Sequence, residues 1–375
     1  MAKVRSTQAC NTEKVRSPWR IAWMRLKRHK LAMISAYALI ILYLSVVLAG
    51  FLAPYHMHAT NRENYIQPPS VIHWKDEDGK LSRPYVYAMK MLDPLTQKYE
   101  EVKDKKFYVT FFTRSDDQRN MWSLLGIKSN IHLFGVRASD GEEGRIFIMG
   151  SDDYGRDYFS RILYGGRASL FVGWAGILIT LTIGMLFGGI SGYYGGWIDN
   201  LMMRSAEIIM SIPSFYLMLA LAAVLPRNLS STMRYFMIVA ILSFIGWAGM
   251  ARIIRGMVLS IKTREYVQAA RAIGSSDMRI ITKHILPNTL SFVIVSATLS
   301  IPSYILGESG LSFLGLGIQE PDASWGNMLS SAMNLQTLER APWNLVAGIF
   351  IFIAVLCYNL FGDGLRDAFD PRSKL

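Results

Sequence analysis

The sequence predicts an all-α membrane protein, a bundle of six transmembrane helices with a small β-rich external domain between the first and second helices. Three observations predict this fold class. Six apolar stretches are long enough to cross a bilayer, Lys and Arg gather on one side of them, and a long segment with short alternating runs separates the first two. The composition, 51% hydrophobic and 18% charged over 375 residues, suits a membrane protein with a sizeable water-exposed part.

The six stretches carry no charged residue and have 17 to 23 residues each. About 20 residues in a helix span the hydrocarbon core, and a helix satisfies its own backbone hydrogen bonds there. The predicted spans are Leu31–Ala53, Ala168–Ile190, Ile208–Leu225, Tyr235–Ala251, Asn288–Gly307 and Pro342–Gly362. Pro213 lies inside the third span and predicts a kink there.

The distribution of Lys and Arg predicts the orientation of the bundle. With the N-terminus inside, the cytoplasmic side holds 20 basic residues in its tails and short loops, against 3 in the short outer loops. We therefore expect residues 1–30 to form a cytoplasmic basic tail, residues 54–150 to lie outside, and both termini to be cytoplasmic. The net charge of +12 then reflects basic loops facing anionic lipid, and we expect no nucleic-acid partner. The first apolar stretch has the length of an uncleaved membrane helix.

The segment 54–150 reads as a small β-rich domain. Its short runs of β-branched and aromatic residues are broken by turn residues, which is typical of strands. The predicted strands are Tyr85–Met89, Phe107–Phe112, His132–Val136 and Arg145–Met149. Residues 151–375 are then expected to contain the remaining five spans.

The loop 252–287 between the fourth and fifth spans predicts two short amphipathic helices joined by a tight turn. The first has an apolar face with helical spacing, formed by Tyr266, Ala269, Ala270 and Ile273. Gly274 suits the end of this helix, and Ser275 or Ser276 could cap the next, with Asp277 in its first turn. The second helix has the stripe Met278, Ile281 and Ile285, and Pro287 ends it or begins the fifth span. By pattern alone, the pair either docks on a partner or packs on its own bundle.

The acidic run at 151–157 precedes the second span. Asp152, Asp153 and Asp157 offer oxygens for a metal ion, but their spacing lacks the alternation of a calcium loop. A capped helix start beside the membrane is the favoured interpretation, with Arg156 and Arg161 pairing with these acids. Arg204 and Glu207, one helical turn apart, predict a further pair.

Several chemistries have no motif here. The sequence has no Gly-x-x-x-x-Gly-Lys-Ser/Thr loop for nucleotide phosphates, no His-Glu-x-x-His and no Gly-x-Ser-x-Gly. Cys10 lies in the basic tail and Cys357 in an apolar span, so no disulfide is expected. We expect a chain that is not an enzyme and binds no cofactor or metal of its own.

The loop 252–287 closely resembles the coupling loop of ABC-importer permeases, a Glu-Ala-Ala pattern with a later glycine and a final Leu-Pro. Five positions of this sequence match that pattern, namely Ala269, Ala270, Gly274, Leu286 and Pro287. Gln268 stands where Glu is usual and His284 where Ile is usual. The ending His-Ile-Leu-Pro-Asn at 284–288 is similar to that of the peptide and nickel branch of the family.

Further matches extend the resemblance over roughly residues 17–53 and 147–375. The segments 150–157 and 160–167 resemble the stretch before the second span in the second permease subunit of peptide importers. Residues 308–317 and 324–326 resemble its outer loop after the fifth span, and 362–367 with Asp370-Pro371 resembles its C-terminus. The segment 54–146 matches least and suggests an enlarged external domain.

The resemblance implies a type I importer-like permease that forms a translocation path in the inner membrane of a bacterium. It implies as partners a second homologous permease, ABC ATPase subunits that bind ATP and magnesium, an external solute-binding protein and a peptide-like solute. The implied ATPase-coupling residues are Glu265, Tyr266, Gln268, Ala269, Ala270, Gly274, Ile285, Leu286 and Pro287. The implied external junction motif is Asp152, Asp153, Gly155, Arg156 and Asp157.

Alternatives remain open from the sequence. Within the family, the solute could be nickel or an oligosaccharide, because solute choice is not legible in these motifs. A different class, an ion-coupled secondary transporter, predicts buried acids in mid-span, and the six predicted spans carry no charge.

Overall fold

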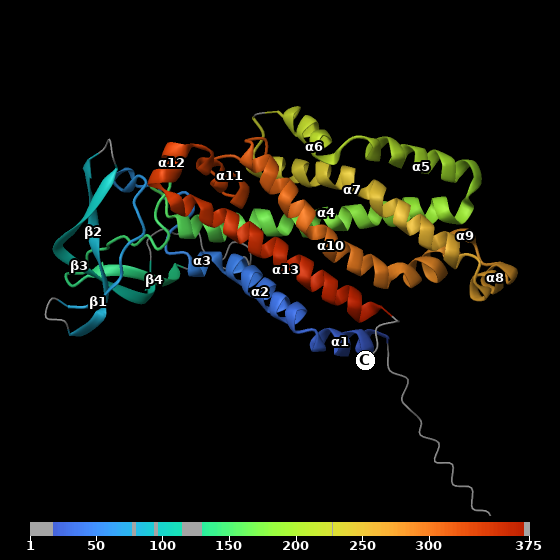
Figure 1. Cartoon of the computed structure of the whole chain (residues 1–375), viewed down its shortest axis with the longest axis horizontal. Coiled ribbons are helices and arrows are strands. Elements are labelled where there is room, and N and C mark those ends of the chain that lie inside the picture. The colour runs from blue at the N-terminus through green and yellow to red at the C-terminus, as the bar shows by residue number, and fades with distance from the viewer. Residues whose placement is uncertain (1–17, 77–79, 94–96, 115–129, 227, 371–375) are drawn as a thin grey trace, which may run out of the picture.

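The computed structural model describes residues 18–76, 80–93, 97–114, 130–226 and 228–370. Most of the predicted basic tail, with Cys10, lies outside the described residues, as does Pro371 of the C-terminal motif. Figure 1 shows a long bundle of helices with a β-sheet at one end.

The helices and strands follow one another along the chain. The N-terminal helices and the sheet are α1 (Pro18–Arg28), α2 (Lys30–Val47), α3 (Ala49–Leu52), β1 (His73–Lys75), β2 (Leu81–Asp93), β3 (Lys98–Arg114) and β4 (Ile131–Ala138). Then come α4 (Tyr158–Tyr194), α5 (Gly196–Ser211), α6 (Ser214–Ala223), α7 (Ser231–Ile261), α8 (Glu265–Ala272) and α9 (Asp277–Arg279). The π-helix η3 (Ile280–Ile285), α10 (Leu286–Phe313), α11 (Trp325–Ser330), α12 (Leu335–Arg340) and α13 (Val346–Phe369) complete the chain, with short 3-10 turns at 62–64, 331–333 and 342–345.

Five helices in the described part of the chain are long and apolar enough to cross a membrane. They correspond to the predicted first, second, fourth, fifth and sixth spans. The third prediction, Ile208–Leu225, is wrong as a single helix, because α5 and α6 meet at an angle of 84° between Ser211 and Ser214. The predicted kink at Pro213 is confirmed, since proline there lacks the N–H that a continuous helix needs. The two helices count as a sixth span only if the bent pair crosses as one unit.

The observed helices differ from the predicted spans at their ends. The first ends at Val47, and the short α3 follows it with a separate axis. Helix α4 begins ten residues earlier than predicted, at Tyr158, because Asp157 caps its N-terminus. Helix α10 continues to Phe313, so the first part of the predicted outer loop 308–317 is helical.

Helix α4 occupies the centre of the bundle. It packs against α7 along one side and against α10 on another. Cores form on both sides of it, one around Trp325 and Tyr158 and one around Ile238 and Tyr304. Apolar side chains of α4 and of the helices around it remain exposed, for example Leu178 on α4 and Phe352 on α13, which is the pattern expected where lipid or a partner covers the surface.

The β-rich domain is confirmed as a four-stranded antiparallel sheet in the order β1-β2-β3-β4. Three of the four predicted strands lie within β2, β3 and β4. The fourth, Arg145–Met149, is wrong: this segment forms no strand, although Ile146 and Phe147 are buried. Ile146 belongs to the core beneath the sheet without joining the ladder, while Met149 packs against the core of the helix bundle.

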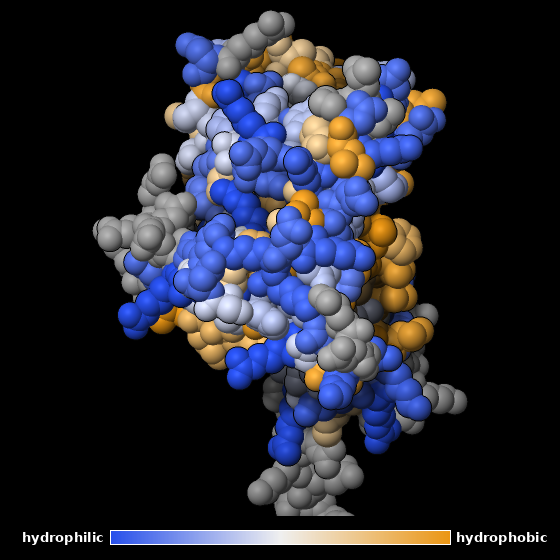
Figure 2. Space-filling model, turned by 90° about the vertical axis from the view of Figure 1, so that its left-hand side faces the viewer, coloured by the Kyte–Doolittle hydropathy of each residue, from blue (hydrophilic) through white to orange (hydrophobic). Residues whose placement is uncertain are grey.

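The sheet is fastened to the membrane helices at one end of the molecule. The ring Nδ1 of His132 on β4 lies 2.7 Å from the carbonyl oxygen of Ala53, just after α3. Helices α8 and α9 lie at the opposite end of the molecule (Figure 1). Figure 2 views the sheet end and shows a largely hydrophilic face, with hydrophobic side chains gathered at its flanks. This end therefore suits contact with water and the flanks suit an apolar environment.

Candidate functional site

The loop between α7 and α10 folds as the two predicted short helices. Helix α8 carries the first half, and α9 with η3 carries the second, which runs without a break into α10. Pro287 lies in the first turn of α10, where proline is tolerated, so it begins the fifth span and does not end the preceding helix.

The tight turn depends on Gly274. This residue has φ +80°, and its N–H bonds to the carbonyl of Arg271 at 3.0 Å. The next N–H, that of Ser275, bonds to the carbonyl of Ala270 at 3.1 Å, which closes the end of α8. A side chain at position 274 meets open space, so its cost comes from the backbone conformation alone. Ser276 occupies the N-cap position of α9 but makes no side-chain cap.

The predicted apolar face of α8 does not act as one face. Val267 and Ala270 are buried against η3 and the end of α7. The other members point outward, with Tyr266 40% exposed and Ile273 83% exposed. The small side chain of Ala270 thus fits an inward contact with the chain's own core.

We call four exposed apolar residues of this loop the docking face, namely Tyr266, Ala269, Ile273 and Met278. The remaining predicted coupling residues lie around it. Glu265 and Gln268 are exposed, Ile285 is fully buried beneath the loop, Leu286 is half-buried and Pro287 is exposed. The predicted coupling residues thus fall into two groups, those that are wholly or partly buried inside the loop and those that are exposed on its surface.

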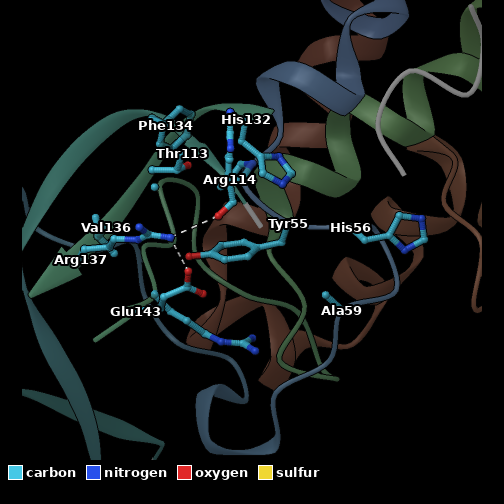
Figure 3. Close-up of a pocket in the computed structure, with 14 residues that line it drawn as sticks. Tyr55, His56, Ala59, Thr113, Arg114, His132, Phe134, Val136, Arg137 and Glu143 are labelled. Carbon is cyan, nitrogen blue, oxygen red and sulfur yellow. Dashed lines mark hydrogen bonds and ion pairs between the residues drawn. The ribbon is translucent and has the colours of Figure 1, made fainter. Parts of the chain in front are cut away.

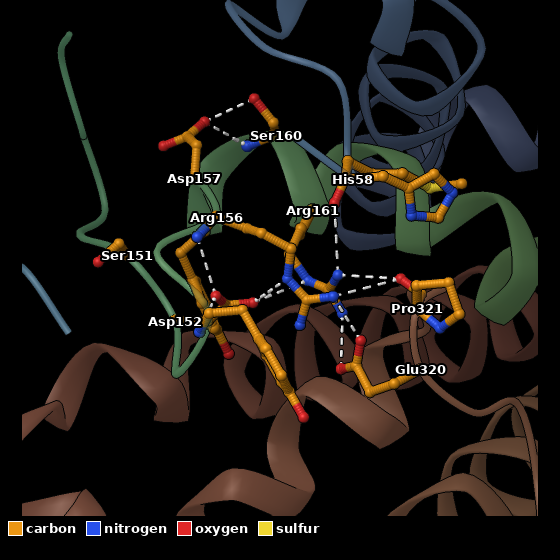
Figure 4. Close-up of polar contacts among 12 residues, drawn as sticks. His58, Ser151, Asp152, Arg156, Asp157, Ser160, Arg161, Glu320 and Pro321 are labelled. Carbon is orange, nitrogen blue, oxygen red and sulfur yellow. Dashed lines mark hydrogen bonds and ion pairs between the residues drawn. The ribbon is translucent and has the colours of Figure 1, made fainter. Parts of the chain in front are cut away.

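The junction motif at the other end of the bundle forms a buried cluster of charges (Figure 4). Arg156 Nε donates to Asp152 Oδ2 at 2.7 Å, and Arg156 Nη1 donates to Glu320 Oε2 at 2.6 Å. Arg161 Nη2 donates to the other oxygen of Glu320 at 2.9 Å, and its Nε lies 3.4 Å from Asp152. The predicted pairing of both arginines with the acidic run is confirmed.

Glu320 was not singled out from the sequence. It lies more than 150 residues from Arg161, in the loop between α10 and α11, and each of its oxygens accepts from one arginine. Arg161 also donates to the carbonyl oxygen of Pro321 at 3.2 Å. The cluster therefore fastens this loop to the start of α4.

Two other members of the motif shape the chain before α4. Gly155 has φ +69°, and a Cβ there would lie 1.8 Å from the carbonyl oxygen of Asn61, so only glycine fits. Asp157 caps α4, because its Oδ2 accepts from the backbone N–H and the hydroxyl of Ser160. Asp153 is partly buried beside the cluster, where burial raises the pKa of its carboxyl. The capped helix start is confirmed, and the described residues hold no group of three metal-ligating side chains.

Asp157 makes stability depend on pH. Burial raises the pKa of its carboxyl to about 7, although the bonds from Ser160 oppose the shift. The folded chain then binds more protons than the unfolded chain between about pH 4 and 7, so this group's contribution falls as pH rises through that window. We expect it to lose about 4 kcal/mol at most. Thermal unfolding in detergent from pH 4 to 8 measures this slope, and Asp157→Asn should flatten it. An unchanged slope in that variant would contradict the assignment.

A cavity of about 640 Å³ opens between α4, α6, α7 and α10. Its lining is mainly apolar and contains no charged side chain among the described residues. Hydroxyl groups are spaced along it, contributed by Thr180, Ser214, Ser296, Ser300, Ser303 and Tyr304. The sequence analysis did not identify these residues, because hydroxyls on apolar helices are not distinguishable there from ordinary packing.

A buried carboxyl group lies just beyond this cavity on α10. Glu308 is fully buried and accepts from Ser169 Oγ at 3.0 Å and from Ser312 Oγ at 2.6 Å. Ser169 in turn accepts from the backbone N–H of Trp325, and Ser312 from that of Ile318. The predicted fifth span ends at Gly307, one residue before Glu308. Helix α10 continues to Phe313, so Glu308 lies within the helix and not in the outer loop as predicted.

A second cavity, of about 390 Å³, lies where the sheet meets the bundle (Figure 3). Arg114, Arg137 and Arg145 line it, against one acid, Glu143. Arg137 Nη2 donates to Glu143 Oε1 at 2.7 Å and to the carbonyl oxygen of Arg114, and the ring of Tyr55 lies beside this pair. The enlarged domain thus presents a basic hollow at the same end as the junction cluster.

These features define a multi-pass membrane protein of the transport class, with a mainly apolar cavity that carries hydroxyl groups within the bundle and an exposed apolar loop at one end. Residues 184–375 match the family described as binding-protein-dependent transport system inner membrane component. Residues 17–69 match the N-terminal transmembrane domain of oligopeptide transport permease C.

Curated relatives agree with this match. The oligopeptide transport system permease protein OppC of Haemophilus influenzae is 42% identical over 264 residues, 70% of this chain and 78% of the relative. The dipeptide transport system permease protein DppC of Bacillus subtilis is 34% identical over 353 residues, 94% of this chain and 85% of the relative. The chain belongs to the family of binding-protein-dependent inner membrane components, and it is the permease subunit of an ABC importer.

Proposed function

We propose that this permease imports short peptides and takes its energy from separate ATPase subunits bound at the docking face. The observation that carries the coupling proposal is the exposed apolar surface of α8 and α9 at the end opposite the sheet. An exposed Ile273 on a short loop is costly in water and favourable against a partner's groove. The chain has no phosphate-binding loop, so ATP and magnesium would be bound by the partner.

The cavity between α4, α6, α7 and α10 supports the path. Apolar walls with isolated hydroxyls can bind an extended peptide backbone without demanding one side-chain charge. The cavity lies beside α6, whose Phe215 and Tyr216 are exposed, so a second homologous permease on this side would complete the wall. The identity of the solute and the position of the path are two separate proposals, and each needs its own test.

The solute is tested by deleting the gene and measuring uptake of labelled dipeptides and oligopeptides, nickel and oligosaccharides. We expect peptide uptake to fall and to return with the wild-type gene, while the other two are unchanged. Loss of nickel or oligosaccharide uptake with normal peptide uptake would refute the peptide assignment. Strains lacking other peptide importers remove redundancy, so that normal uptake in them also counts against it.

The orientation is proposed from the 20-to-3 excess of basic residues on one side. It places the sheet and the basic hollow outside, where an external solute-binding protein would release its solute. It places α8 and α9 in the cytoplasm. Two exposed positions at opposite ends of the molecule test this, Lys103 in β3 and Lys283 in η3.

In a cysteine-free background, Lys103→Cys should react with a membrane-impermeant maleimide in intact spheroplasts. Lys283→Cys should react only after the membrane is permeabilised. The reverse pattern would overturn the proposed topology.

A further inference from the structure

The inner end of α4 is attached directly to the two short helices of the loop. The hydroxyl of Tyr193 donates to Asp277 Oδ1 at 2.7 Å and accepts from Arg271 Nη2 at 3.0 Å. The guanidinium of Arg271 also lies over the ring of Tyr193, 5.2 Å from its centre. Tyr193 is buried, while Arg271 and Asp277 lie on α8 and α9 respectively. One side chain of α4 therefore holds both halves of the loop.

A third contact strengthens the attachment. Lys262, which follows α7, donates from Nζ to the carbonyl oxygen of Gly192 at 2.8 Å. The last carbonyls of a helix lack partners within the helix, so a cation at this position satisfies one of them. The end of α4 is thus fixed to the residues on either side of the turn from α7 into α8.

The inner half of α4 packs closely against α7. A Cβ at Gly188 would lie 2.5 Å from the carbonyl oxygen of Ala251, and one at Gly192 would lie 2.9 Å from that of Arg255. Such contacts bring the two backbones together, as small residues do between membrane helices. The two helix backbones therefore lie in close contact over the inner half of α4.

Helix α4 continues unbroken for 37 residues to the opposite end of the molecule (Figure 1). At about 1.5 Å per residue this is a connection of about 55 Å. Its far end carries Arg161, which pairs with Glu320, and Ser169, which donates to Glu308. One continuous helix thus joins the loop at one end to Glu320 in the 314–324 segment and to Glu308 of α10 at the other.

We infer that Tyr193 is a positioning residue that transmits movement of α8 and α9 into α4, and through α4 to the 314–324 segment. This inference rests on the proposed docking of an ATPase at α8 and α9, and it adds α4 to the two helices, α7 and α10, that the chain itself joins to the loop. The alternative is that Tyr193 only anchors the loop, in which case its hydroxyl affects assembly or stability and not coupling.

The test uses the complete transporter in proteoliposomes and measures peptide transported per ATP hydrolysed. Tyr193→Phe keeps the ring and its contact with Arg271 but removes both hydrogen bonds. We expect ATPase co-purification and the unfolding temperature to stay unchanged, while transport per ATP falls about tenfold. Tyr194→Phe is the matched control, because Tyr194 is the exposed neighbour of Tyr193 and contacts it edge to face.

A second pair of variants tests the partner. Asp277→Asn keeps an acceptor for the hydroxyl and should retain coupling, whereas Asp277→Ala should reproduce the loss seen with Tyr193→Phe. Normal transport per ATP in Tyr193→Phe would overturn the inference, as would loss of ATPase binding in that variant. Absence of ATPase from the wild-type preparation would instead refute the proposed function itself, so the two failures are distinguishable.

Discussion

Replacing Arg161 with alanine is expected to destabilise the folded chain by about 3 kcal/mol, because it removes a buried cation that pairs with Asp152 and Glu320 and leaves both acids to share Arg156. The Arg161 side chain is 1% exposed and contacts both Glu320 and Asp152. Without Arg161, the Glu320 carboxylate still accepts a hydrogen bond from Arg156. The carbonyl oxygen of Pro321 loses the hydrogen bond that Arg161 donates to it. Thermal unfolding of the purified chain in detergent, followed by tryptophan fluorescence, measures the loss.

The matched control is Arg204→Ala. Arg204 pairs with Glu207 at 3.1 Å, as the sequence predicted, but its side chain is 80% exposed. An exposed pair contributes about 0 to 1 kcal/mol, so this variant should unfold close to the wild-type temperature. Arg161→Lys should fall between the two, since an ammonium group cannot reproduce the fork of a guanidinium. Equal shifts for the Arg161 and Arg204 variants would show that the junction cluster contributes no special stability.

A negative charge at Ile273 is expected to abolish transport while leaving the chain folded in the membrane. Ile273 is 83% exposed at the end of α8, so the carboxylate of Ile273→Glu lies in water when no partner is bound. If an ATPase covers this position, the buried charge costs about 3 kcal/mol, equivalent to about a hundredfold weaker association. Co-purification of the ATPase and peptide uptake measure the effect, beside the amount of permease in the membrane.

Gln268→Glu is the control for the charge itself. Gln268 is exposed on α8, at the position where the family pattern usually has Glu. This variant should therefore still bind the ATPase and support peptide uptake. Ala270→Glu is expected to behave differently from both, because Ala270 is buried and a charge there should disrupt the loop. Full ATPase retention with normal uptake in Ile273→Glu would show that the loop is only a connector.

Local patterns predicted much of the loop and the junction correctly. Gly274 was assigned to the end of a helix, and it has the positive φ that glycine adopts at low cost. Asp157 was placed at a capped helix start, and its carboxylate accepts the bonds of an N-cap. Both features depend on a few neighbouring residues, so sequence spacing is sufficient to recognise them.

Burial on α8 could not be predicted in the same way. Tyr266, Ala269, Ala270 and Ile273 have the spacing of one face, yet Ala270 points inward beside Val267 and the others point outward. Helix α8 has only eight residues, and its apolar residues are spread over most of its circumference. Its orientation is therefore set by the surface on which it packs, here η3 and the end of α7, and not by its own periodicity.

Local hydropathy, backbone chemistry and short motifs were sufficient to predict five of the membrane-long helices, the kink at Pro213, the β-rich domain and the family. The angle of 84° between α5 and α6 depends on how these helices pack, and so it could not be predicted from the sequence. Only the tertiary structure decided that Glu320 joins Arg156 and Arg161, that Glu308 is buried among serines, and that Tyr193 meets both halves of the loop. These contacts join residues far apart in the chain, and their partners are chosen by how the helices pack.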